Sequence, residues 1–128
     1  SEAIVALMGK TKPPYNVSSL NQEEALGGLS RPLEFERQLS IILQQRLLLE
    51  NELRGLSLVR RVYPSDANFL LVEVTDANKI YEYLVGKKVV TRNRNSVVRN
   101  CIRITVGTPE ENRVLMEELR NYGMNEND

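Results

Sequence analysis

The stretch CIRITVGTPEEN, residues 101–112, constrains the fold of this 128-residue chain more than any other. Ile102, Ile104 and Val106 are apolar and alternate with polar residues. A period of two is typical of a strand that buries one of its faces. Arg103 is therefore predicted to stand in the middle of a strand, on the face opposite the core.

A helix start follows that strand directly. Thr108 is the predicted N-cap and Pro109 suits the first helical position. Glu111 stands three residues after the N-cap, where it completes a capping box. The chain thus passes from a half-buried strand into a capped helix, which is typical of a fold that packs helices on a sheet.

Helical patterns dominate the first half of the chain. The sequence predicts helices over residues 1–9, 22–28 and 30–54, each of which ends at or beside glycine. Ser19 or Asn21 is the expected N-cap of the second helix. The third helix carries apolar residues at helical spacing that are expected to face the core: Phe35, Leu39, Ile42, Leu49 and Leu53.

Strands and helices alternate in the second half. Strands are predicted over residues 56–64, 67–74, 87–93 and 101–106, and helices over residues 75–86 and 108–120. Residues 67–74 are apolar almost throughout, which favours a central strand buried on both faces, and residues 121–128 are expected to be frayed. The predicted class is α+β: an N-terminal helical arm and a long helix, then a ββαββα domain with a mostly antiparallel sheet covered by helices on one face. The arm is assigned to residues 1–28 and the domain to residues 29–128.

Composition excludes several classes of function. The chain has 17 Lys and Arg against 17 Asp and Glu, so we expect neither nucleic acid nor an anionic membrane as a partner. No apolar run is long enough to span a bilayer, and no signal peptide is visible. Cys101 is the single cysteine and is expected to be a packed structural thiol in a reducing cytoplasm.

The chain contains no histidine. This removes the commonest general base, the commonest metal ligand and every Ser-His or Cys-His nucleophile pair. No metal-ligand spacing and no phosphate-binding glycine loop is present either. We therefore assign no catalytic, cofactor-binding or metal-binding residue to this chain.

Two arginines are the candidate binding residues. Arg92 and Arg103 lie on predicted strands joined by a polar loop, so pairing of the strands brings them together on one face. Two adjacent guanidinium groups repel each other unless an anion bridges them, and their planar geometry suits carboxylate or phosphate. Alternatively, each arginine pairs with a carboxylate such as Glu73 or covers the sheet with its aliphatic stem.

Four motifs point to a known family. KTKPPYNVSSL, VYPSDANFLLVEV, VVTRNR and CIRITVGTPEEN occur in this order along essentially the whole chain. Together they closely resemble the C-terminal part of histidinol-phosphate aminotransferases, which are fold-type I pyridoxal-phosphate enzymes. The resemblance implies amino transfer between L-glutamate and imidazole-acetol phosphate in histidine biosynthesis. It also implies that residues 1–28 are a crossover that packs on a large domain.

The resemblance gives the arginines roles. It implies that Arg103 binds the substrate carboxylate or phosphate and that Arg92 helps to hold the phosphate. The loop between them is shorter than the family form, which leaves Arg94 as an alternative to Arg92. Tyr15 and Asn16 match the KPPYN arm, which is expected to shape the domain junction.

The resemblance implies that the family's reactive lysine lies before residue 1, and Lys10 and Lys12 match no Schiff-base motif. The resemblance therefore implies pyridoxal phosphate in the intact enzyme and none bound to this chain, which is expected to be inactive alone. The intact enzyme is expected to be a homodimer acting on small molecules. This chain is expected to form a dimer or larger species, with possible swapping of the arm, through apolar surface around Ile4, Val5 and Leu7.

Two other interpretations stay open. The first is the small domain of a related phosphate-handling pyridoxal-phosphate decarboxylase. The second is a freestanding, non-enzymatic α+β module that binds small anions or a partner chain. RNA binding on the sheet is set aside, because the chain has only two Phe and five Tyr with which to stack bases.

Overall fold

The computed structural model of the chain describes residues 2–11 and 17–125, without the side chains of the two end residues Thr11 and Asn125. Tyr15, Asn16 and Lys12 lie outside these residues. The chain divides into two compact units, Ser1–Glu36 and Arg37–Asp128, and each is described by itself. The predicted boundary between residues 28 and 29 stays a prediction.

The first unit is helical. It holds α1 (Glu2–Thr11), α2 (Ser19–Leu29) and the first turn of α3 (Pro32–Arg54). The N-cap of α2 is Ser18, whose hydroxyl accepts the backbone N–H of Asn21 at 3.2 Å. The prediction of Ser19 or Asn21 as N-cap was wrong because Ser18 already has the extended backbone and the acceptor that a cap needs.

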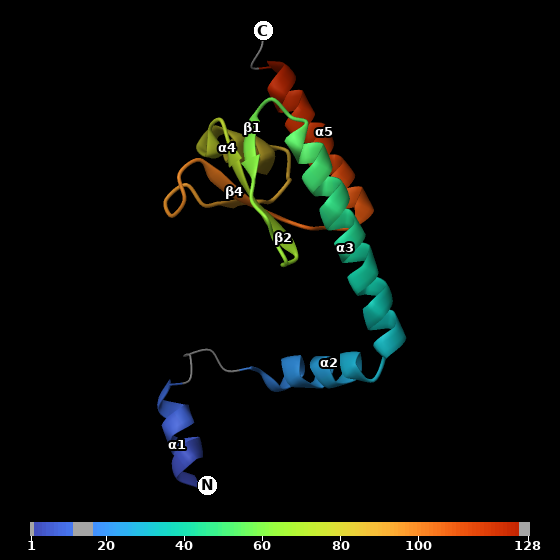
Figure 1. Cartoon of the computed structure of the whole chain (residues 1–128), viewed down its shortest axis with the longest axis vertical. Helices are drawn as coiled ribbons and strands as arrows, with labels where there is room; N and C mark the ends of the chain where they lie inside the picture. Colours follow the sequence, from blue (N-terminus) through green and yellow to red (C-terminus); the bar gives the residue numbers. More distant parts are fainter. Residues whose placement is uncertain (1, 12–16, 126–128) are drawn as a thin grey trace. The chain divides into compact units, whose positions relative to one another are not determined.

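The second unit is an α+β sandwich (Figure 1). Its remaining elements are β1 (Val59–Val62), β2 (Phe69–Val74), α4 (Ala77–Gly86), β3 (Arg92–Asn93), β4 (Cys101–Thr105) and α5 (Pro109–Asn125). The four strands lie in the order β1-β2-β4-β3, and every neighbouring pair is antiparallel. The predicted fold class is confirmed, although the third strand is much shorter than expected.

All three helices of this unit cover one face of the sheet. The buried core draws on each layer: Leu49 and Leu53 of α3; Leu70, Val72, Val74, Ile102 and Ile104 of the strands; Ile80 and Leu84 of α4; and Leu115, Met116 and Leu119 of α5. In β2 the alternate residues Phe69, Leu71 and Glu73 are only half-buried. The expectation that this strand is buried on both faces was wrong, because no helix of the unit covers its second face.

Only the C-terminal half of α3 belongs to this core. Leu49 and Leu53 are buried, whereas Phe35 and Leu39 are 62% and 42% exposed, so the expectation that all five apolar positions face the core was wrong. The hydrogen bonds that hold α3 against the rest of its unit begin at Gln45 and Arg46. Figure 1 shows this half of α3 beside α5.

The strand predicted over residues 87–93 consists of Arg92 and Asn93 alone. Lys87, Lys88 and Val89 donate their backbone N–H groups to carbonyls of α4. Lys88 has a left-handed φ of 62°, as is common just after a helix end. The chain therefore finishes α4 before it can extend into the sheet.

The last helix is longer than predicted. α5 continues to Asn125, and Tyr122 is 9% exposed and part of the core. Its ring meets that of Tyr83 edge-on with 5.1 Å between centroids. The prediction of a frayed segment from residue 121 was therefore wrong for residues 121–125, because an aromatic contact with α4 anchors the final turns.

Candidate functional site

The two candidate arginines lie directly opposite each other. In the β3–β4 ladder Arg92 pairs with Arg103, and on its other side Arg103 faces Leu71 of β2. Directly opposite residues share a face, with their Cβ atoms about 5 Å apart. The expected juxtaposition on the face opposite the helices is confirmed, while the roles of both residues stay a prediction.

Arg103 is held by an aromatic ring. Its Cζ atom lies 5.0 Å from the centroid of the Phe69 ring, and it is half-buried. Its Nε atom is buried and has no hydrogen-bond partner among the described residues. A guanidinium over a ring gains cation–π attraction without losing its charge. Arg103 is therefore positioned by the Phe69 ring, and no hydrogen bond from a described residue occupies its Nε atom.

The alternative in which Glu73 neutralises Arg103 is not what the structure shows. Glu73 instead accepts a hydrogen bond from the Tyr63 hydroxyl at 3.5 Å. Within residues 2–11 and 17–125, no carboxylate forms an ion pair with Arg92 or Arg103. The second part of that alternative, an arginine stem laid across the sheet, stays a prediction, because the contact with Phe69 is made by the guanidinium carbon.

Arg94 directly follows the last residue pair of this ladder. Its backbone N–H donates to the carbonyl of Cys101 at 2.9 Å, so it stands opposite Cys101. The register therefore places Arg92, and not Arg94, across from Arg103. Which of them is the second anion ligand stays a prediction.

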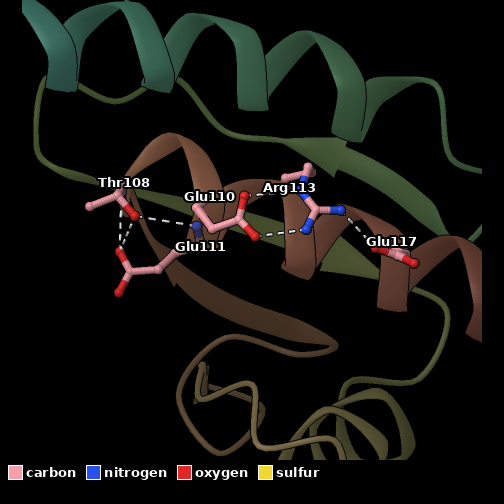
Figure 2. Close-up of polar contacts among 5 residues, drawn as sticks. All are labelled: Thr108, Glu110, Glu111, Arg113 and Glu117. Carbon is pink, nitrogen blue, oxygen red and sulfur yellow. Dashed lines mark hydrogen bonds and ion pairs between the residues drawn. The ribbon is translucent and has the colours of Figure 1, made fainter.

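The predicted capping box is present at the start of α5 (Figure 2). Thr108 N donates to Glu111 Oε2 at 2.7 Å, and Glu111 N donates to Thr108 Oγ1 at 3.3 Å. The bond from the Thr108 backbone, followed by that from its hydroxyl, holds the pKa of Glu111 below its usual value of 4.5. The box fixes where the helix begins.

Asn112, which was not predicted to have a role, holds the same turn through hydrogen bonds. Asn112 is 7% exposed, and its side chain accepts from Gly107 N at 3.0 Å and donates to Gly107 O at 3.1 Å. It also donates to Gln45 Oε1 of α3 at 3.0 Å. A polar residue on the apolar side of a predicted helix was the available signal, since a buried amide is normally hydrogen-bonded.

A cavity beside the start of α5 does not contain the arginine pair. It measures about 450 Å³ and lies between residues 88–91 and the start of α5. Its lining includes Val89, Val90 and Ile104, with Glu110 and Glu111 at the helix start. The arginine pair is on the open face of the sheet, and neither arginine lines this cavity.

Cys101 is fully buried, and burial followed by the nearby Glu73 carboxylate raises the pKa of its thiol above 9.0. A thiol is nucleophilic only as the thiolate. The structure therefore agrees with the expectation of a packed structural thiol.

The described residues do not fit a pyridoxal-phosphate site. A Schiff-base lysine is activated by removal from water, but Lys10, Lys79, Lys87 and Lys88 are all exposed. The described lysines therefore offer no Schiff-base partner for this cofactor. Within the described ranges, no three His, Cys, Asp or Glu residues are grouped so as to bind a metal. No described helix is long and apolar enough to cross a membrane.

Comparison with known proteins gives concordant results. A family profile described as aminotransferase class I and II matches residues 1–119. Histidinol-phosphate aminotransferase from Bacteroides thetaiotaomicron is 47% identical over 124 residues, which are 95% of this chain and 36% of that protein. The protein of the same name from Cytophaga hutchinsonii is 43% identical over 124 residues, with the same coverage of 95% and 36%.

The fold also has a solved counterpart. The crystal structure of histidinol-phosphate aminotransferase from Clostridium acetobutylicum aligns with a TM-score of 0.81 at 21% identity, over 98% of this chain and 39% of that one. At this identity the likeness concerns the fold alone. The chain spans little more than a third of the length of these relatives.

Proposed function

The chain belongs to the class I and II aminotransferase family, and from that premise we propose that it is the C-terminal portion of a histidinol-phosphate aminotransferase. Two curated relatives of that name support this specific branch. The resemblance first seen in the KPPYNVSS and CIRITVGTPEEN motifs is confirmed. The proposed activity of the intact enzyme is amino transfer between L-glutamate and imidazole-acetol phosphate.

The observation that carries this proposal is the pairing of Arg92 with Arg103. Like charges directly opposite each other destabilise a sheet, so the arrangement is costly unless an anion lies between them. A carboxylate or a phosphate can bridge two guanidinium groups with charge-assisted hydrogen bonds. Arg103 would grip the substrate carboxylate or phosphate, and Arg92 would help to hold the phosphate.

The remaining parts of the reaction would come from outside the described residues. In the intact enzyme, pyridoxal phosphate serves as the electron sink. The residues of this chain bind and orient the substrate beside it. Since the described lysines are exposed, this chain alone is proposed to be inactive. We place the intact enzyme in the cytoplasm as a homodimer.

The first test is to sequence the gene upstream of the codon for Ser1, in frame. A frame that continues through a lysine in an S-K-x-x-G-L-like context supports the proposal. A start codon immediately before the codon for Ser1 would contradict it and favour a freestanding anion-binding module.

The second test measures amino transfer by the product of the continued frame, with L-glutamate and imidazole-acetol phosphate as substrates. Arg103→Gln should lower kcat/KM by about two orders of magnitude, as expected when a charge-assisted contact to the substrate is lost. Arg61→Gln is the matched control, because Arg61 lies on β1 opposite Glu73, and β2 separates β1 from the strand of Arg103. Equal activity of the two variants would contradict the role of Arg103.

A further inference from the structure

Asparagine side chains tie the loop between β3 and β4 to the first turn of α4. Asn93 Nδ2 donates to Asn78 Oδ1 at 2.8 Å, and Asn95 Nδ2 donates to the same oxygen at 3.3 Å. Within the loop, Asn95 N donates to Asn93 Oδ1 at 2.9 Å, and Asn100 N donates to Asn95 Oδ1 at 2.7 Å. We call Asn78, Asn93, Asn95 and Asn100 the asparagine clamp.

Backbone donors fix the orientation of each amide in the clamp. Asn93 and Asn95 each receive a backbone N–H, so the atom that accepts it must be the side-chain oxygen. Their NH₂ groups are then left to point at Asn78, whose own side chain must present its oxygen. Asn78 thus acts only as an acceptor in the clamp, whereas Asn95 must both accept and donate.

The clamp lies behind the arginine pair. Asn93 pairs with Ile102, whose side chain is in the core, so Asn93 points to the helical side of the sheet. Because successive strand residues point to opposite faces, the neighbouring Arg92 points to the open side. Fixing Asn93 against α4 therefore fixes where Arg92 stands across from Arg103.

The hydrogen bonds of the β3–β4 ladder alone hold Arg92 only weakly in position. β3 contributes only two residue pairs to the sheet, and the residues before it follow the end of α4. The loop after it returns to β4 through Asn100, which has a left-handed φ of 53°. A two-residue strand with such a loop needs contacts beyond its own ladder to hold one position.

We propose that Asn78 and Asn95 are positioning residues that hold Arg92 in place for an anion bridged by Arg92 and Arg103. This inference rests on the proposed function of the two arginines. The anion is the carboxylate or phosphate class already named, and the described hydrogen bonds of the clamp run among its asparagines and the loop backbone, not to Arg92 or Arg103.

The test compares two variants with the same added charge in nearly the same place. Asn78→Asp keeps the acceptor oxygen that the clamp uses, whereas Asn95→Asp loses the donor to Asn78. Inorganic phosphate is titrated at constant ionic strength and followed by NMR. Asn95→Asp should bind phosphate about fivefold more weakly than Asn78→Asp, the effect of losing about one hydrogen bond. Asn78→Ala should show a similar loss relative to wild type.

Hydrogen exchange reports on the loop without any ligand. The Arg94 amide, which bonds to Cys101 O, should exchange about fivefold faster in Asn78→Ala, while the Tyr63 amide, bonded to Leu71 O, should not change. Equal phosphate affinity of the two Asp variants, or unchanged exchange at Arg94, would overturn the clamp while leaving the anion site intact. A wild-type chain that binds no phosphate would overturn the proposed anion site itself.

Discussion

Arg103 faces Arg92 across the β3–β4 ladder while its guanidinium lies over the ring of Phe69. The structure therefore presents two positive charges side by side, with one of them held in place by an aromatic contact. This arrangement has a cost in the absence of an anion, and that cost can be measured.

Replacing Arg92 with Gln should stabilise the chain in chloride and remove its response to phosphate. Loss of the like-charge pair should raise the free energy of unfolding by about 0.3 kcal/mol. Wild type should instead melt at a higher temperature in phosphate than in chloride of equal ionic strength, because a ligand that binds only the folded state stabilises it. Thermal denaturation in both salts measures the difference. An identical phosphate response in wild type and Arg92→Gln would count against a shared anion site.

The capping box predicts a stability change in acid. The pKa of Glu111 is held below 4.5 in the folded chain, so its contribution is present above pH 4.5 and is lost as the pH falls through the folded pKa. Glu110, whose pKa the Arg113 guanidinium lowers, changes with the same sign. Glu111→Gln keeps an oxygen that can accept the hydrogen bonds of the box but does not titrate. The free energy of unfolding, measured in urea, should therefore depend less on pH in this range.

Thr108→Ala tests the other half of the box. Loss of the N-cap hydroxyl should cost about 1 kcal/mol at neutral pH. Urea unfolding measures this cost, and Thr105→Ala, at an exposed strand position nearby, is the control. A Thr108→Ala variant as stable as wild type would show that the box does not support α5.

Cys101 predicts a stability change in alkali. Burial raises the pKa of its thiol above the usual 9.0, so the folded state is at full stability below pH 9.0 and loses stability as the pH rises through the folded pKa. Tyr83, whose pKa is raised by burial and then by Glu118, acts in the same direction above pH 10.0. Cys101→Ala should cost about 1 kcal/mol near neutrality and should reduce the alkaline loss. Urea unfolding across this pH range checks both effects.

Local signals account for the parts of the fold that could be predicted. The alternation in β4 and the cap at Thr108 each depend on neighbours within a few residues, and both are confirmed. The length of β3 could not be predicted because the end of α4 determines where the strand begins. The burial of Tyr122 could not be predicted because it depends on Tyr83 in a different helix.

The same distinction holds for the candidate site. The facing of Arg92 and Arg103 followed from two strands joined by a short loop. Phe69 was missed because it belongs to β2 and reaches Arg103 diagonally across the sheet. Asn78 was missed because a helix residue that binds a distant loop leaves no periodic pattern in the sequence.

The exposed side chains of α1 predict self-association. Four apolar side chains of this helix are between 59% and 70% exposed in the structure: Ile4, Val5, Leu7 and Met8. Exposed apolar patches commonly mark surfaces that bind another protein. Light scattering at high concentration should find a dimer or larger species. Val5→Lys should shift it toward monomer, whereas Lys10→Gln on the same helix should not. A monomeric wild type would contradict the prediction.

The final turns of α5 should contribute to the stability of the whole domain. Tyr122 is nearly buried against Tyr83, and removing a buried aromatic ring costs about 3 kcal/mol or more. Tyr122→Ala should therefore lower the urea midpoint markedly, while Asn121→Ala, at the exposed position next to it, should change it little. Because the Tyr83 hydroxyl also donates to Glu118 Oε2 at 2.8 Å, Tyr122→Ala should loosen α4 as well as α5. Faster amide exchange in both helices would show this coupling, and a midpoint equal to that of Asn121→Ala would show that the last turns are dispensable.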